Sequence, residues 1–251
     1  MVRQGQSSNL APLMLRLALG LTFLWAGLGK FNAYDDVKGE QAARLANIGA
    51  LDLPKSAAEP KGDHAGPESG TQPTTPAANP SSTAPTPKLM YGASDFPDAV
   101  RARRMHTSVT LRILEAAEPK EPEPGQPARK IWPAFASGSN AVMLAWVVAI
   151  TDIAGGVCLL LGLLTRLWAL VLAGHMAVGM WLMLIGPAIQ TGNTVLGFLP
   201  RHDPWDGSFW MYPLWILALL AMNLALVFLG AGSVSLDRPL LGEAVRAPAR
   251  T

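Results

Sequence analysis

Long apolar stretches alternate with polar segments along this chain. Four of them approach the roughly 20 residues that a helix needs to cross the hydrocarbon core of a bilayer, and they cover residues 11–31, 141–164, 167–189 and 212–231. Only Thr165 and Arg166 separate the second stretch from the third, which requires a tight antiparallel hairpin. The pattern predicts an all-α integral membrane protein, an antiparallel bundle of four transmembrane helices.

The charged residues are gathered between the first two stretches. Only 15% of all residues are charged, which argues against an ordinary soluble domain. Residues 31–136 carry 12 basic and 13 acidic side chains, 25 of the 38 in the chain. We therefore divide the chain into a first span (1–31), a polar insertion (32–136), a three-span unit (137–231) and a tail (232–251).

Arginines in the short flanking segments predict the orientation of the bundle. An even number of spans places both termini on one side of the membrane, together with Arg3, Arg166, Arg238, Arg246 and Arg250. The short third loop has only Arg201, next to two aspartates. The positive-inside rule then places both termini in the cytoplasm, with the insertion outside. The first stretch is long for a signal peptide and is interrupted by Arg16, so we expect it to remain as an uncleaved span.

The insertion is predicted to contain two linkers and two short helices. Residues 56–88 and 118–127 are Pro-rich and have few large apolar side chains. Burying them would not offset the conformational entropy lost on ordering, so we expect a partly disordered outward loop. Apolar periodicity predicts helices at residues 98–117 and around residues 34–48. These helices either cover the outer face of the bundle or form a docking surface for a partner or for anionic lipid. They are too small for an independent catalytic domain with its own core.

Five polar side chains lie within or at the ends of the predicted spans and are the candidate functional residues: Arg16, Lys30, Asp152, His175 and Asn223. Polar groups are costly to expose to lipid, so we expect most of them to point into the bundle. Helical spacing supports this, because Arg16 shares a helix face with two glycines and Asp152 lies on a face of small residues.

Asp152 is the most costly of these groups, because it lies near the middle of its span and must be paired or protonated. We expect a pair with Arg16, whose long side chain can reach inward, with His175 at a depth between them. Lys30 is expected to extend to the outer boundary. The pair either sets helix register or belongs to a site that handles protons or a quinone headgroup, and the sequence leaves both open.

The remaining residues exclude several classes of function. The single cysteine, Cys158, leaves no internal disulfide, CxxC redox motif or Cys-rich metal site, and we expect it to be a buried structural residue. The loop histidines have no neighbours at metal-ligand spacing, and no haem-attachment motif or catalytic set is recognisable. We therefore expect no metal and no covalently bound cofactor. The net charge of +2, without a basic stripe, argues against nucleic-acid binding.

Three motifs resemble the DoxX family of small bacterial membrane proteins. They are LRLALGLTFLWAGLGKF at residues 15–31, TDIAGGVCLLLGLLTRLWAL at 151–170 and GAGSVSLDRPL at 230–240. The positions that carry the resemblance are Gly27, Gly155, Gly156, Arg166, Gly230, Gly232, Ser235, Leu236 and Asp237. The chain departs from the family in having Asp152 where glutamate is more usual, and in its long Pro-rich insertion. The resemblance implies a four-helix bundle that sometimes serves as a subunit of a quinone-linked oxidoreductase, such as thiosulfate:quinone oxidoreductase.

Three functions fit these observations. The leading hypothesis is a membrane subunit of a respiratory or other redox complex, which binds quinone or supports a partner that does. The first alternative is a structural or assembly protein in which the charges only set helix packing. The second is a small transporter or proton conductor that uses Asp152 and His175, although the chain has no visible inverted repeat and no Pro-broken helix pair. The sequence carries no electron-carrier motif, so redox chemistry would need quinone or a partner subunit.

Overall fold

The computed structural model describes residues 4–51, 90–119, 129–232 and 235–237. The linker predicted at residues 56–88 and most of the one at 118–127 lie outside these ranges. Within them the chain is mostly helical, and two short two-stranded sheets accompany the helices.

Four helical segments are long and apolar enough to span a membrane, which confirms the prediction of four spans. The first is α1 (Gln4–Asn32), and the second is α4 (Ser139–Leu161). The third begins as α5 (Thr165–Met180) and continues through the π-helical turn η5 (Trp181–Ile185) into α6 (Gly186–Thr191). The fourth is α7 (Gly207–Leu229). The protein is thus a membrane protein with a helical transmembrane bundle.

Two helix ends differ from the sequence-based boundaries for local reasons. The turn between α4 and α5 occupies residues 162–164, with Gly162 and Leu164 both at positive φ, and Thr165 is already helical. The last helix starts five residues before the predicted boundary at residue 212. Asp206 caps it by accepting hydrogen bonds from the backbone N–H groups of Ser208 and Phe209.

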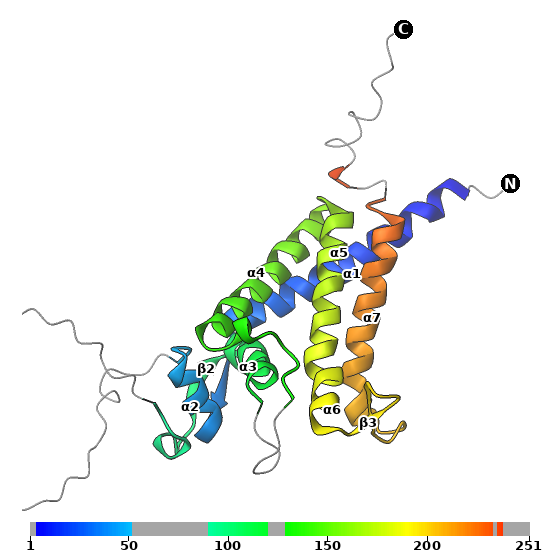
Figure 1. The fold of residues 1–251 in the computed structure, drawn as a ribbon. Helices are drawn as coiled ribbons and strands as arrows, with labels where there is room; N and C mark the ends of the chain where they lie inside the picture. The colour runs from blue at the N-terminus through cyan, green and yellow to red at the C-terminus, as the bar shows by residue number, and fades with distance from the viewer. Residues whose placement is uncertain (1–3, 52–89, 120–128, 233–234, 238–251) are drawn as a thin grey trace, which may run out of the picture.

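The bundle consists of two pairs of helices. The helix α1 packs along α4, and α5 packs along α7, with smaller contacts between α4 and α5 and between α1 and α7. Towards the lower end of Figure 1, α1 and α4 lean away from α5 and α7. The start of α1 and the end of α7 lie at the upper end, and the polar insertion lies at the lower end.

Glycines allow the first pair to approach closely. A Cβ atom added at Gly156 would lie 2.7 Å from the backbone nitrogen of Leu24 and 2.8 Å from the carbonyl oxygen of Gly20. Small residues at such crossings let two helix backbones touch. Close packing of this kind stabilises helix pairs in lipid, where the hydrophobic effect does not drive their association. The predicted small face of the second span is therefore the one that meets α1.

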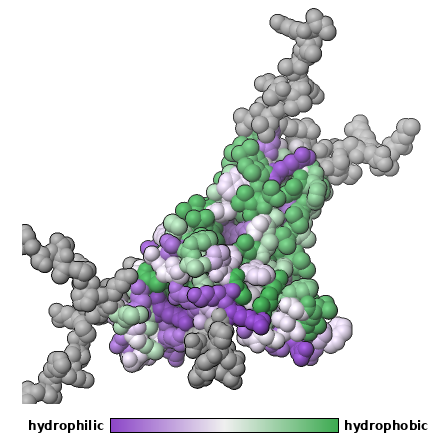
Figure 2. Space-filling model, in the orientation of Figure 1, coloured by the Kyte–Doolittle hydropathy of each residue, from purple (hydrophilic) through white to green (hydrophobic). Residues whose placement is uncertain are grey.

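Apolar side chains fill the bundle and also cover its outside. The interior cluster draws on all four spanning helices and consists of Leu19, Phe23, Leu159, Ala169, Leu172, Leu219 and Leu226. Large apolar residues such as Trp25 and Phe228 are exposed on the outer surface. Figure 2 shows this as a mainly hydrophobic upper part above a hydrophilic lower end. An apolar exterior of this extent is what lipid contact requires.

The polar insertion folds onto the end of the bundle opposite the start of α1. Its first strand, β1 (Tyr34–Val37), pairs antiparallel with β2 (Val100–Arg103). Between and after them lie α2 (Gly39–Asn47), η2 (Ala93–Asp95), the π-helical η3 (His106–Thr110) and α3 (Leu111–Ala117), and η4 (Ala134–Ala136) leads into α4. The interpretation that these elements cover the bundle is supported, because η3 and α3 contact α4, and α3 also contacts η5.

Both helices predicted in the insertion are partly wrong. Residues 34–37 and 100–103 form strands, because Val37 and Ala102 point into an apolar core while Arg101 stays exposed. Opposite charges support the pairing, since Asp36 lies across from Arg101 in the register. The helical prediction holds for residues 39–47 and, including the π turn, for residues 104–117.

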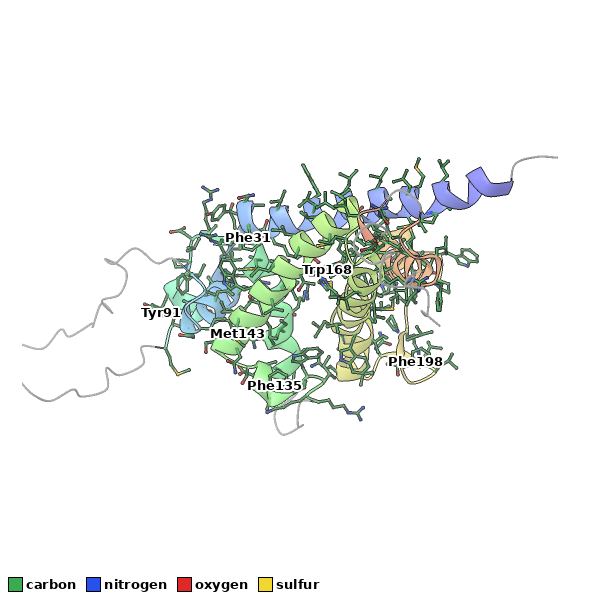
Figure 3. All side chains as sticks on the ribbon, turned by 90° about the horizontal axis from the view of Figure 1, so that it is seen from above. Phe31, Tyr91, Phe135, Met143, Trp168 and Phe198 are labelled. Atoms are coloured by element: carbon green, nitrogen blue, oxygen red, sulfur yellow. The ribbon has the colours of Figure 1, made fainter. Side chains whose placement is uncertain are left out.

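A small core joins these elements, which the short apolar segments of the insertion did not lead us to expect. It contains Val37, Ala42, Ala43, Leu45, Ala50, Leu51, Phe96, Ala102 and Leu111. Asp35 ties its strand to η3 by accepting hydrogen bonds from the Thr107 hydroxyl and from Arg104. These contacts, chiefly the one from Thr107, lower the pKa of Asp35. In Figure 3, Phe31 and Tyr91 mark this side of the molecule, and Phe198 lies beyond α5.

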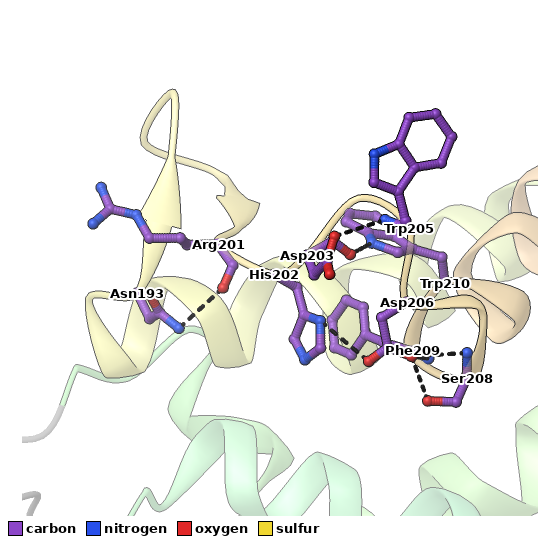
Figure 4. Close-up of polar contacts among 9 residues, drawn as sticks. All are labelled: Asn193, Arg201, His202, Asp203, Trp205, Asp206, Ser208, Phe209 and Trp210. Atoms are coloured by element: carbon purple, nitrogen blue, oxygen red, sulfur yellow. Dashed lines mark hydrogen bonds and ion pairs between the residues drawn. The ribbon is translucent and has the colours of Figure 1, made fainter.

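The third loop is held by local hydrogen bonds. It contains a minimal hairpin of β3 (Thr194–Val195) and β4 (Leu199–Pro200). In Figure 4 the His202 ring stacks on Phe209, with ring centroids 3.9 Å apart, and its Nδ1 lies 3.5 Å from Asp206. The hydrogen bond from the Ser208 hydroxyl is the main cause that lowers the pKa of Asp206.

The contact between α1 and α4 leads to the first prediction. Gly156→Ala places a methyl group against the backbone of α1, so the two helices must separate. Overpacking of this kind typically costs about 1–3 kcal/mol in the free energy of unfolding. Gly179→Ala on α5 is the matched control, because nothing lies within 4 Å of its added Cβ. Thermal unfolding of the detergent-purified variants measures the difference, and equal stability of the two would contradict this packing.

Candidate functional site

The Asp152 carboxylate is the centre of the polar site inside the bundle. It lies on α4, and its side chain is only 1% exposed. The Lys30 ammonium on α1 lies 2.6 Å from Oδ2, and the His175 Nδ1 on α5 lies 2.8 Å from Oδ1. Three of the four spanning segments therefore meet at one carboxylate, and we call these three residues the Asp152 site.

Glycine and aromatic neighbours position the three side chains. Gly27 lies one turn before Lys30, and a Cβ atom there would come within 3.1 Å of the Asp152 Cβ. The absence of that atom lets α1 approach, so that the short aspartate and the lysine can meet. On the other side, the Phe23 ring lies against the His175 ring, with centroids 6.5 Å apart.

The two oxygens of Asp152 are in different situations. Oδ2 accepts a hydrogen bond from Lys30, so that one positive and one negative charge balance each other. Oδ1 and the His175 Nδ1 are close, but they do not meet in hydrogen-bond geometry, and neither has another hydrogen-bond partner among the described residues. The arrangement can therefore hold or pass on a proton at His175 or at Oδ1.

The predicted pair between Arg16 and Asp152 is wrong. The Arg16 guanidinium instead donates to three carbonyl oxygens, those of Leu159 at 2.9 Å, Leu160 at 3.2 Å and Ala231 at 3.0 Å. The reason is the register of α1 on α4. Gly20 packs against Gly156 and Leu160, so Arg16, one turn earlier, reaches the end of α4, where backbone carbonyls lack helical partners.

The expectation for Lys30 is also wrong. Its side chain turns inward to Asp152 and is 17% exposed, whereas we expected it to extend to the outer boundary. The same antiparallel register explains this, because Gly27 of α1 lies against Asp152 and Lys30 is the next residue on that face. The spacing of Gly27 and Lys30 showed that they share one face of the first helix. It did not show which helix packs against that face.

The motif residues near the turn between α4 and α5 have structural roles. Asp237 accepts hydrogen bonds from the backbone N–H groups of Leu164 at 2.5 Å and Thr165 at 2.9 Å, so it caps the start of α5. The backbone N–H of Leu236 and that of Asp237 donate to Leu161 and Gly162. The C-terminal part of the third motif therefore stabilises the α4–α5 turn.

The glycines of the motifs mark further close approaches. Gly155 faces Leu172 of α5, and Gly27 and Gly156 face α1 or α4 as described. Gly230, at φ +77, leaves room for the Arg166 guanidinium, since a Cβ there would lie 2.9 Å from Nε. Gly232 has positive φ, and Ser235 lies beside Gly162. These contacts give the motif glycines a role in packing.

The other candidate polar residues lie apart from the Asp152 site. Asn223 is fully buried on α7 and donates to the Leu219 carbonyl of its own helix. Cys158 is a half-buried free thiol. His106 is buried in η3 beside the Thr110 hydroxyl. Within the described part of the chain, no group of three or more His, Cys, Asp or Glu side chains could hold a metal ion.

The observed pairing predicts the outcome of a double-mutant experiment. Asp152→Leu or Lys30→Leu alone leaves an uncompensated charge in the bundle, which typically costs about 3–5 kcal/mol. The combination of both substitutions should recover much of that loss. Arg16→Leu combined with Asp152→Leu is the control, and its losses should add, because Arg16 donates to carbonyl oxygens at the end of α4 and Asp152 binds Lys30. Denaturant unfolding in detergent measures the free energies of the three single and two double variants, and recovery only in the Arg16 combination would refute the Lys30 pair.

Comparison with known proteins agrees with this architecture. Residues 130–184 match the model of the DoxX family, and this stretch contains α4, the turn and α5, and with them Asp152 and His175. No curated protein and no solved structure matches the chain. Over α4 and α5 the chain is therefore similar to the DoxX family, and its four apolar spanning segments make it a membrane protein.

Proposed function

We propose that this protein is the integral membrane subunit of a quinone-linked or other redox complex, and that the Asp152 site exchanges protons with a quinone headgroup. The observation that carries the proposal is a buried carboxylate with one oxygen bound to Lys30 and the other facing an imidazole without a formed hydrogen bond. Ionisable groups inside a membrane are costly, and they commonly serve proton transfer or ligand binding.

The residues present fit a quinone headgroup. Its carbonyl oxygens accept hydrogen bonds, and the Lys30 ammonium and a ring N–H of His175 are donors. The side chains of Lys30 and His175 are 17% and 16% exposed, whereas Asp152 is 1% exposed. A ligand that arrives from the membrane therefore meets the two donors first, and Asp152 supports them from behind.

Each residue has a distinct part in the proposed chemistry. When bound, a quinone supplies a carrier for two electrons and two protons. His175 holds the proton that is exchanged, because an imidazole can both accept and donate a proton. Asp152 orients the ring through Oδ1 and stabilises its charged form. Lys30 pairs with Asp152 through Oδ2 and donates a further hydrogen bond to the headgroup. Electrons would come from a partner protein, which is why we place this chain in a complex.

We further propose that both termini are cytoplasmic and that the membrane is a bacterial inner membrane. The arginine bias of the short flanks supports this orientation. The polar insertion then faces outward, at the end of the bundle opposite the termini. In this orientation Lys30, near the end of α1, places the Asp152 site towards the outer half of the membrane.

A structural role is the alternative that the same contacts favour. An ion pair that joins α1, α4 and α5 would also fix helix register without any ligand. The experiment below separates the two roles.

Quinone retention tests the proposal. We expect the protein, purified in mild detergent, to retain quinone that mass spectrometry of a solvent extract detects, together with co-purifying subunits. Asp152→Asn and His175→Gln should reduce the retained quinone by about tenfold or more, since a lost charged hydrogen bond costs about 1.5–3 kcal/mol. His202→Gln is the control, because that imidazole stacks on Phe209 in the outer loop. Equal quinone content in all variants, or no quinone in the wild type, would contradict the quinone proposal and favour the structural role.

Site-directed labelling tests the orientation. In a Cys158→Ala background, a cysteine at Thr75 should react with a membrane-impermeant maleimide added to intact cells, and one at Gly242 should react only after the membrane is opened. The positive-inside distribution predicts this pattern. The reverse pattern would place the insertion in the cytoplasm.

A further inference from the structure

A groove of about 440 Å³ lies between the polar insertion and the outer end of the third span. Its walls come from α2, α3, the chain at residues 129–131, and the η5–α6 end of the third span. It shares no residue with the Asp152 site. We propose that this groove binds the phosphodiester headgroup of an anionic phospholipid from the adjacent leaflet.

Three guanidinium groups line the groove and give it a positive balance. Arg44 pairs with Glu40 through Nε at 3.3 Å, and Arg112 pairs with Glu115 through Nη1 at 3.0 Å. Arg129, the third, has no carboxylate partner among the described residues. Three cations against two anions leave one positive charge. The paired arginines each use one nitrogen, so their other N–H groups remain for a phosphate, which arginine binds in a bidentate way.

Apolar residues from both sides also line the groove. Leu182 and Pro187 lie in the last turns of the third span, and Leu111 and Ile131 belong to the insertion. A headgroup region is where charged and apolar surfaces must meet, because the phosphate lies above the start of the acyl chains. Figure 2 shows the corresponding transition, with hydrophilic residues gathered at the lower end below the apolar part. A free anion would leave these apolar residues uncovered, which is why we favour lipid.

The groove is held in shape by a bridge between its walls. The Gln190 amide on α6 donates to the carbonyl oxygens of Glu115 at 3.3 Å and Arg129 at 3.2 Å. The Trp181 ring N–H donates to the Ile131 carbonyl at 3.2 Å. These bonds tie the end of the third span to the insertion, so the arginines of one wall keep a defined position over the apolar residues of the other. A preformed site of this kind loses less entropy when a ligand binds.

Native mass spectrometry of the full-length protein in detergent tests the proposal, with phosphatidylglycerol and phosphatidylcholine as probes. We expect the wild type to retain phosphatidylglycerol preferentially. Arg112→Gln and Arg129→Gln should each weaken this retention about fivefold, the usual contribution of one arginine near an anionic headgroup. Arg201→Gln, in the exposed third loop, is the control and should change nothing. Equal retention of both lipids by the wild type, or an equal loss in the control, would overturn the proposal.

Two further measurements keep the test decisive if a variant folds poorly. Hydrogen exchange of the wild type should slow at residues 111–117 and 182–190 when phosphatidylglycerol is added, and not with phosphatidylcholine. Millimolar inorganic phosphate should neither reproduce this protection nor displace the lipid. Protection by phosphate alone would show that the groove takes a soluble anion, and no protection by either would show that it is not an anion site.

Discussion

Burial of the Asp152 carboxylate in an apolar bundle is the constraint that organises the half of the bundle next to the insertion. A lone charge at that depth is costly, so a cation must come from another helix. Lys30 supplies it, because Gly27 lets the backbone of α1 approach α4 closely enough for a short aspartate to reach it. His175 approaches the same carboxylate from α5. One buried group thereby joins the α1–α4 pair to the α5–α7 pair, and it also creates the proton-active site that we propose for quinone.

At the opposite end of the bundle, the requirement is that the backbone N–H and C=O groups at the helix ends find hydrogen-bond partners. Arg16 donates to the last carbonyls of α4, and Asp237 accepts from the first N–H groups of α5. Such groups have no partner inside their own helix, and water does not reach them freely in a membrane. Much of the DoxX motif is explained by this turn and by close packing at glycines. Asp152 and His175, in the matched residues 130–184, are the positions that packing alone explains least.

The polar insertion adds a cap over the outer end of the bundle without entering the Asp152 site. Its two ends meet as β1 and β2, and α3 lies against α4 and η5. The groove that this contact forms has arginines on the insertion side and apolar residues on the membrane side. A lipid there would stabilise the cap, and the quinone proposal does not depend on it, because the two sites use different residues.

Apolar run lengths by themselves determined the four spanning helices, since a chain in lipid must satisfy its backbone hydrogen bonds internally. The candidate residues were also visible, because ionisable groups are rare in such runs. The sequence did not show that residues 100–103 form a strand, because β1 and β2 are far apart in the chain and a four-residue alternation is too short to recognise. It also assigned Asp152 to Arg16. Periodicity along one helix shows which residues share a face, but the register between two helices depends on their packing. Only the tertiary structure, through the contacts at Gly20, Gly27 and Gly156, decided that Lys30 meets Asp152 and that Arg16 meets the end of α4.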